Sequence, residues 1–335
     1  MEKAKSNIFE FCSIYQISRA GHRPQEHLFT LKSSMGLYEF LKLPLIIQFF
    51  DISKYFDKEV LTDVMNSLYQ AGIKGKLYRL WYKMNCSTRI QVKTAVGMSK
   101  TKFTGANVGQ GTVGGSLASA LSLDTGFNKY FDGSDKEFYY GSQRVQPMLY
   151  QDDAARLAIS VESAQSGNKK VECIMKEKQL QLNLDKTVYI ICGKDQQVNT
   201  IKDQITKSLL TMNNQIMKHI EADKYLGDMI HCEGIEASID ATVKSRHWRA
   251  TSAIMEIKSI LQDCRVNSIG GIACGLELWE LGVIPMLLNN SSTWYNISSE
   301  TMKKLSNFQN DMFRILFNTP RTTPLISLWW DLGTF

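Results

Sequence analysis

Residues 147–159 read PMLYQDDAARLAI, with two short apolar runs on either side of the acids Asp152 and Asp153. Runs of this length predict a pair of strands joined by a tight turn that carries both acids. Another apolar run, residues 43–50, predicts a buried strand that ends at Asp51. The sequence therefore places three carboxylates at the ends of predicted strands.

Carboxylates at the tips of buried strands are a common way to hold a divalent cation. Two acids ~4 Å apart repel each other by ~4 kcal/mol at an effective dielectric of 20, so a cation or a proton must offset the charge. Mg²⁺ needs only one or two protein carboxylates besides waters and substrate phosphates. Without other motifs, a turn explains Asp152 and Asp153 more simply, and a helix cap explains Asp51.

The remaining apolar spacing divides the chain into two parts. Predicted strands and helices are mixed up to a strand over residues 188–192, and a hairpin is predicted from Arg89 to Phe103. From about Ile235 onward the spacing is helical throughout. We therefore predict an α+β domain followed by an all-helical one, with the boundary between Leu226 and Glu236.

Composition narrows the function only a little. The 335 residues carry a net charge of +6, an excess that suits nucleic acid but also many neutral-substrate enzymes. The seven cysteines show neither CxxC nor zinc-finger spacing, which favours a reducing compartment. The sequence lacks both a membrane-spanning apolar stretch and a secretory signal, so we expect an intracellular protein, nuclear or cytoplasmic, without a membrane partner.

Four segments, in order, resemble the polymerase motifs of reverse transcriptases. Residues 49–57 (FFDISKYFD) are similar to motif A, residues 109–111 (GQG) with Ser116 to motif B, residues 150–153 (YQDD) to motif C, and residues 182–187 (LNLDKT) to motif D. Each motif is weak alone, but the order and spacings together are specific. Residues 225–227 (YLG) and the helical tail resemble the enzymes of non-LTR, LINE-type retrotransposons.

The resemblance implies an RNA-directed DNA polymerase with a right-hand architecture. Residues 1–42 would be a remnant of the fingers, residues 43–229 a palm of antiparallel sheet with helices on one face, and residues 230–335 a helical thumb. Its partners would be an RNA template, a DNA primer and deoxynucleoside triphosphates. Its cofactor would be two Mg²⁺ ions, with Mn²⁺ as a possible substitute.

The resemblance also implies roles for individual residues. The metal ligands would be Asp51, Asp152, the Ile52 carbonyl and, more weakly, Asp153. Lys186 would neutralise or protonate the leaving pyrophosphate, although a solvated lysine explains it equally well. The nucleotide would contact Phe56, Gln110, Gly111, Lys54 and Gln151.

Phe56 stands where an aromatic ring leaves no room for a ribonucleotide 2′-hydroxyl, and core packing is its simpler explanation. Lys244, Arg246 and Arg249 form a basic cluster that predicts backbone phosphate contacts, with a solvated helix face at least as good an explanation.

The sequence departs from the family's pattern before motif A. A fingers segment with a basic residue that grips the triphosphate is not recognisable there, so we expect activity to be weak. The alternative to a polymerase is therefore a truncated, non-catalytic remnant that keeps the fold and weak nucleic-acid binding.

Overall fold

The computed structural model describes residues 23–86, 89–103, 108, 114–131, 138–140, 142–193, 195–263, 269–295 and 297–327. The chain forms two compact units, Met1–Glu221 and Ala222–Phe335. The first mixes strands and helices, and the second consists of one hairpin and helices. A mixed fold was predicted; the assignment of residues 43–229 and 230–335 to a palm and a thumb stays a prediction.

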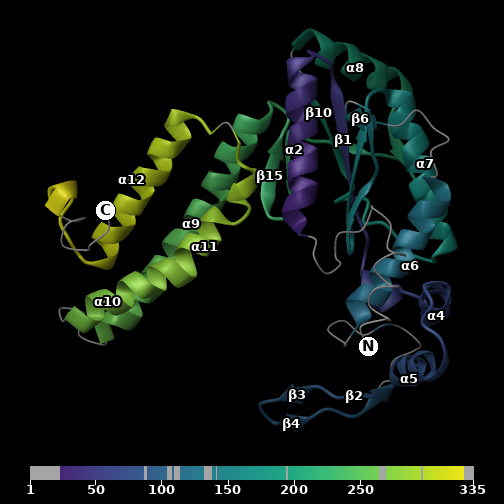
Figure 1. The fold of residues 1–335 in the computed structure, drawn as a ribbon, viewed down its shortest axis with the longest axis horizontal. Helices are drawn as coiled ribbons and strands as arrows, with labels where there is room; N and C mark the ends of the chain where they lie inside the picture. Colours follow the sequence, from purple (N-terminus) through teal and green to yellow (C-terminus); the bar gives the residue numbers. More distant parts are fainter. Residues whose placement is uncertain are drawn as a thin grey trace. The chain divides into compact units, whose positions relative to one another are not determined.

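A five-stranded sheet lies at the centre of the first unit (Figure 1). Its order is β13 (Lys218–His219), β10 (Val188–Cys192), β1 (Leu45–Asp51), β9 (Asp153–Ala158) and β8 (Met148–Tyr150). All neighbours are antiparallel except β10 and β13. The strands predicted at residues 43–50, on both sides of the acids, and at 188–192 are confirmed. β1 is paired on both sides, with β10 as far as Phe49 and with β9 as far as Asp51.

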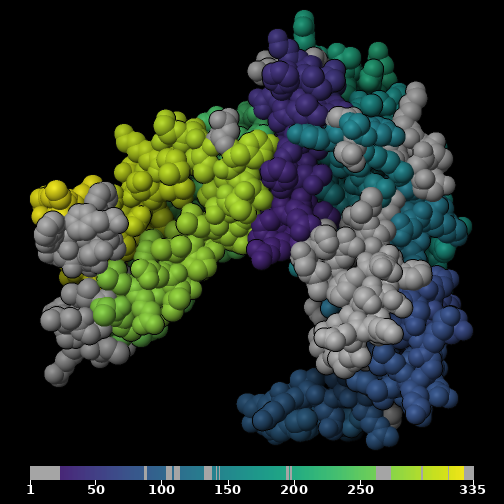
Figure 2. Space-filling view, in the orientation of Figure 1, coloured from purple at the N-terminus to yellow at the C-terminus, as the bar shows by residue number. Residues whose placement is uncertain are grey.

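Seven helices of the first unit are described. They are α2 (Pro24–Phe40), α3 (Tyr55–Lys58), α4 (Leu61–Gln70), α5 (Gly75–Asn85), α6 (Gly115–Tyr130), α7 (Val161–Glu177) and α8 (Asp195–Ser208). The small hairpins are β2–β5 (Arg89–Ile90, Lys93–Thr94, Gly97–Met98 and Lys102–Phe103), β6–β7 (Phe138–Tyr140 and Gln143–Val145) and β11–β12 (Thr211–Met212 and Gln215–Ile216). The predicted hairpin between Arg89 and Phe103 is confirmed, and it is the dark-blue arm in Figure 2.

Helices α6, α7 and α8 cover one face of the sheet. Ile46 and Phe50, two even-numbered positions of β1, share a buried cluster with Phe127, Ile174 and Ile201 from the three helices. Burial of a large apolar side chain contributes about 1.5–3 kcal/mol. The opposite face is covered too, because the odd-numbered positions of β1 are also buried, whereas we predicted helices on one face alone.

A buried set of hydrogen-bonded polar side chains lies on the helix-covered face of the sheet. Gln48 of β1 bonds to Asn168 of α7 at 2.7 Å and accepts from the Arg156 guanidinium of β9 at 3.0 Å. Gly167 of α7 lies against that guanidinium, and a Cβ there would be 2.5 Å from its atoms. A side chain at position 167 would therefore displace the Arg156 guanidinium from its bonds to Gln48 and Ser163.

The second unit packs helices around an aromatic core. A hairpin of β14 (Ala222–Tyr225) and β15 (Asp228–His231) leads into α9 (Ile235–Asp263). There follow α10 (Ile269–Leu278), the π-helical turn η1 (Trp279–Val283), α11 (Ile284–Leu288), the 3₁₀ turn η2 (Ser291–Thr293) and α12 (Ser299–Leu316). Ile254, Trp279 and Phe313 belong to the shared core. Within the described residues, no helix combines the length and apolarity needed to cross a membrane.

Candidate carboxylate site at the strand ends

The sheet register brings two of the predicted acids directly opposite each other. Asp51, the last residue of β1, is the Cα partner of Asp153, the first residue of β9. Directly opposed side chains in an antiparallel pair share a face and have Cβ atoms about 4.5–5.5 Å apart. Although a hundred residues separate them in sequence, these two carboxylates therefore lie together.

Asp152 lies in the tight turn beside this pair. Tyr150 pairs with Asp153, so Gln151 and Asp152 are the two central residues of a two-residue hairpin loop. Gln151 has a φ of +57°, as the favoured hairpin turns require. A non-glycine residue there costs of order 1–3 kcal/mol, and such strain is common where a chain must aim a functional side chain.

The predicted motif D segment wraps around Asp51. The amide of Asn183 donates to the Asp51 carbonyl at 2.8 Å, and the amide of Ser53 donates to the Gln181 carbonyl at 2.8 Å. These two bonds flank a bridge between Ile52 and Leu182. The Ile52 carbonyl takes no part in this ladder, so its oxygen faces away from residue 182, as the predicted ligand role needs.

Lys186, on the same segment, supplies positive charge beside the carboxylates. Its ammonium Nζ lies 3.9 Å from Asp51 Oδ1, and the two side chains are 69% and 29% exposed. An exposed pair at this distance contributes only about 0–1 kcal/mol. Lys186 can therefore leave Asp51 at little cost if a stronger ligand of either side chain arrives.

The arrangement suits a hard divalent cation. Among the described residues, no group of three or more His, Cys, Asp or Glu is assembled as a metal site. Mg²⁺ does not require such a group, because it keeps waters and takes one or two carboxylates plus substrate phosphates. Asp51 and Asp153, with Asp152 alongside, provide oxygen ligands of the right kind.

The register bears on only part of what was predicted for the two adjacent acids. It makes Asp153 the direct Cα partner of Asp51, and the convergence of the Asp51 and Asp152 carboxylates at a metal stays a prediction. Asp152 is near the buried Tyr55 phenol: burial raises the pKa of Tyr55 well above its ordinary value, and the charges of Glu59 and Asp152 add to this. The two-residue turn includes Asp152, and β9 starts at Asp153.

The predicted nucleotide contacts are only partly described. Phe56 is half-buried against the core of the sheet, with its ring 5.3 Å from that of Tyr55. Lys54 is exposed and, with φ of +50°, is the N-cap of α3. Gln110 and Gly111 lie outside the described residues.

In the second unit, the structure corrects the role expected of Arg246. Its guanidinium is buried and donates to the Asp228 carboxylate and to the carbonyls of Gly227 and Leu287, at 2.9 Å and 3.0 Å for the latter two. Burial lowers the pKa of Arg246, while Asp228 acts in the opposite direction. These donors are committed inside the unit, so Arg246 is a core residue and not a phosphate ligand.

The other two members of that basic cluster are at the surface. Lys244 is paired with Asp240 at 2.7 Å, one helical turn earlier, and Arg249 is exposed. Both can reach solvent, and their contact with nucleic acid stays a prediction.

Two features of the first unit escaped the sequence analysis. One is a buried group beside the site, in which Tyr55 donates to the Ser119 carbonyl and the Ser119 hydroxyl donates to Glu59. Nothing in the sequence indicated this group, because a single polar residue within an apolar pattern does not show which residue it bonds to. The other is the lack of any Asp or Glu between Asp63 and Asp124, which a count of charged residues along the sequence would have found.

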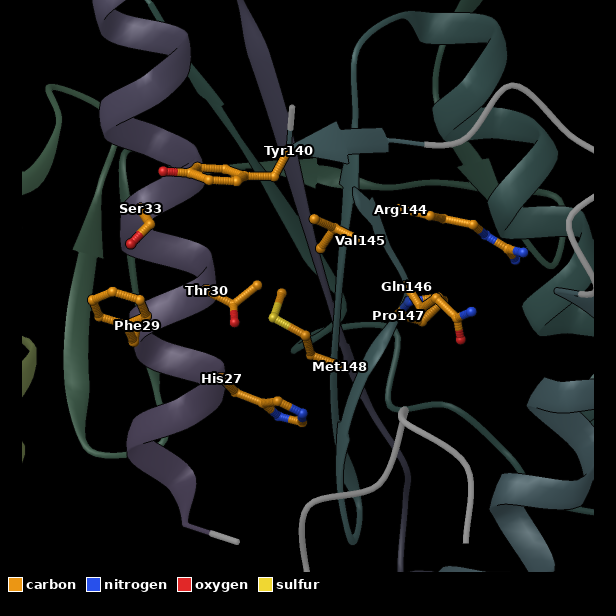
Figure 3. A pocket seen from close by; sticks show the side chains of 10 residues that line it. All are labelled: His27, Phe29, Thr30, Ser33, Tyr140, Arg144, Val145, Gln146, Pro147 and Met148. Atoms are coloured by element: carbon orange, nitrogen blue, oxygen red, sulfur yellow. The ribbon is translucent and has the colours of Figure 1, made fainter. Parts of the chain in front are cut away.

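A separate pocket of about 310 Å³ lies between α2 and the strands β6–β8 (Figure 3). Met148 points toward Thr30 of α2, and Tyr140 lies across from Ser33. The lining is largely apolar and holds none of the predicted site residues. The carboxylates at the strand ends remain the better candidate for chemistry.

No family model matches the chain, and no curated protein matches its sequence. Solved telomerase structures do resemble it. Apo telomerase from Candida tropicalis has a TM-score of 0.48 at 10% identity, over 95% of this chain and 54% of that one. Telomerase from Candida albicans, in complex with the TWJ fragment of telomeric RNA, has a TM-score of 0.46 at 11% identity, over 99% and 56%. The chain thus spans about half the length of these telomerase chains.

Proposed function

We propose that the chain is the polymerase domain of a reverse transcriptase of the non-LTR retrotransposon kind. It would add deoxynucleotides to the 3′-hydroxyl of a DNA primer along an RNA template. The first unit would act as the palm and the second as the thumb. The observation that supports this most is the pairing of Asp51 with Asp153, with Asp152 in the adjoining turn, between segments that carry motifs A, C and D.

The residues present fit the roles that nucleotidyl transfer needs. Asp51, Asp153 and Asp152, with the Ile52 carbonyl, would hold two Mg²⁺ ions. When bound, the ions would activate the attacking hydroxyl and neutralise charge on the phosphates. Lys186, weakly held at 3.9 Å from Asp51, would turn toward the leaving pyrophosphate.

The side chains around α3 would position the nucleotide. Phe56 is half-buried and packs against the core of the sheet beside Tyr55. There it would lie under the sugar, where an aromatic ring excludes a 2′-hydroxyl. The exposed Lys54 would contact phosphate.

The test is primer extension on poly(rA)/oligo(dT) with Mg²⁺ or Mn²⁺. Asp51→Asn should lower the rate by roughly two to three orders of magnitude, because it removes charge that acts on the transition state. Asp203→Asn, the same change on the exposed surface of α8, is the matched control and should retain the wild-type rate.

Two outcomes would count against the proposal. If folded wild-type chain does not extend the primer with either ion, the non-catalytic alternative is correct. If Asp51→Asn and Asp203→Asn extend equally well, the activity belongs to another site or to a contaminant.

A further inference from the structure

The basic excess of the chain is concentrated in one segment. Residues 64–123 contain no Asp or Glu. They hold eight cations: Lys74, Lys76, Arg79, Lys83, Arg89, Lys93, Lys100 and Lys102. Because the chain has 39 basic and 33 acidic residues in all, the remainder holds 31 basic and 33 acidic residues and is slightly negative. The segment alone accounts for the net charge of +6.

The structure puts all eight cations on an open surface. They lie on α5 and on the β2–β5 hairpin, which we call the basic arm (Figure 2), and every one is exposed. Lys93, Lys100 and Lys102 form no ion pair within the described part of the chain. Like charges crowded into a segment that contains no Asp or Glu repel one another, so a polyanion would relieve the repulsion.

Apolar side chains are interleaved with these charges. Leu80 of α5 is 56% exposed, and Val92 and Met98 of the hairpin are 59% and 58% exposed. A lone two-stranded hairpin is marginally stable in water. Tyr82 of α5 is 45% exposed, and an aromatic ring among cations suits a strand that offers both phosphates and unstacked bases.

The arm is nevertheless anchored to the layer that carries the site. α4, which precedes α5, shares a buried cluster with α6 through Leu61, Val64 and Leu121. Tyr78 and Trp81 of α5 pack against the same cluster. α6 in turn packs on the sheet through Phe127. Whatever the arm binds is therefore held by the same unit as Asp51.

We infer that the basic arm binds the phosphate backbone of single-stranded RNA. This deepens the proposed function, since the RNA would be the template, but it rests on charge and exposure that do not depend on catalysis. Sequence-independent binding is expected, because lysines contact phosphates without reading bases.

The experiment is RNA binding by the full chain, measured by fluorescence anisotropy with a labelled single-stranded oligoribonucleotide. The buffer contains EDTA and no triphosphate, so that catalysis cannot contribute. The test variant carries Lys93→Gln, Lys100→Gln and Lys102→Gln. The control carries Lys202→Gln, Lys207→Gln and Lys218→Gln, three exposed lysines elsewhere in the first unit, and loses the same charge.

Each phosphate contact contributes about 0.7 to the salt dependence of binding to a single strand. Loss of three contacts should lower the slope of log K against log salt by about 2, and the affinity by roughly 100-fold at 0.1 M salt. The control should lose less than about threefold. A second test variant on α5, with Lys74→Gln, Lys76→Gln and Lys83→Gln, covers the case in which the hairpin variant fails to fold by circular dichroism.

Equal losses in test and control variants, or no loss in either test variant, would overturn the inference. So would test variants that lose binding to anionic lipid vesicles but keep RNA affinity. Failure of the inference and failure of the proposed function are distinguishable. If the wild-type chain extends primers and the arm variants bind RNA normally, only the inference about the basic arm is wrong. If RNA binding depends on the arm but the chain does not extend primers, only the proposed polymerase function is wrong.

Discussion

Asp51 and Asp228 are two aspartates in opposite circumstances. Asp228 begins β15 in the second unit and is fully buried, with its carboxylate accepting from Arg246, from Asn290 at 3.1 Å and from Trp294 Nε1 at 3.1 Å. Asp51 ends β1 in the first unit, 29% exposed, with another acid across the ladder and one loosely held lysine. The first has a neutralising partner, and the second has a like-charged one.

The difference separates a structural carboxylate from a chemical one. Removing a charge from water costs several kcal/mol, which Asp228 recovers only through its partners in a fixed geometry. Asp51 keeps part of its hydration, and its nearest protein neighbours favour the arrival of a cation. Bonding capacity that the fold leaves open is therefore the sign of a candidate site.

The largest expected effect comes from removing the buried Asp228 carboxylate. Asp228→Ala should lower the free energy of unfolding by about 3–5 kcal/mol, because it leaves the Arg246 guanidinium buried without a counter-charge. Asp51→Ala should change it by less than about 1 kcal/mol. Urea denaturation followed by tryptophan fluorescence measures both, since Trp279 and Trp294 are buried in the second unit and Trp81 packs against a buried cluster of the first.

The double variant Asp228→Leu, Arg246→Met is the control. It removes both charges and should recover much of the lost stability. If Asp51→Ala proves as destabilising as Asp228→Ala, the distinction between the two aspartates is wrong.

Glu59 is a third carboxylate to set beside these two, because it is buried like Asp228 but, in the described residues, no cation bonds to it. Burial raises the pKa of Glu59 from 4.5 to about 7, and the Ser119 hydrogen bond only partly opposes this. The folded chain then holds a proton that the unfolded chain releases, so stability is full below pH ~4.5 and falls as the pH rises through about 7. The loss should reach roughly 3 kcal/mol at most.

Glu59→Gln should remove this dependence. Thermal unfolding of both proteins between pH 5 and pH 8 would show wild type losing stability across that range and the variant changing less. Identical profiles would mean that Glu59 is ionised in the folded chain or paired with a cation.

The smallest expected effect concerns Phe56, which lies near the open aspartate. Phe56→Val should raise ribonucleotide incorporation by about tenfold or more, because it opens space for the 2′-hydroxyl. The loss of buried area should cost only about 1–2 kcal/mol of stability. Extension with rNTPs and dNTPs in turn gives the ratio, and an unchanged ratio would return Phe56 to a packing role alone.

Much of this arrangement could be predicted because periodicity and turn chemistry are local. The apolar run before Asp51 and the paired acids after Tyr150 specify strands and a turn by themselves. The register between β1 and β9 is not local, because it depends on which face of each strand meets α6–α8. For this reason the pairing of Asp51 with Asp153 could not be predicted from either strand alone.

Arg246 is a residue whose role could not be predicted from local sequence. Lys244, Arg246 and Arg249 have the same composition as a phosphate-binding helix face, and only their direction in space separates a core residue from two surface ones. A helix turns by about 100° per residue, so two positions of sequence move a side chain from one face to the other. The direction of the Arg246 side chain could not be predicted without the β14–β15 hairpin, because Asp228 of that hairpin accepts from the guanidinium.

The position of β1 between β9 and β10 has a consequence for how the site can be lost. Local openings in a protein begin where few bonds hold a segment, and central strands open only with the whole cooperative unit. Asp51 ends a strand paired on both sides, while in the described residues the β2–β5 hairpin of the basic arm pairs as strands only within itself. Mild heat or protease should therefore reach the surface that would hold the nucleic acid long before the carboxylates separate. A damaged chain would lose that surface while Asp51 and Asp153 still lay opposite each other.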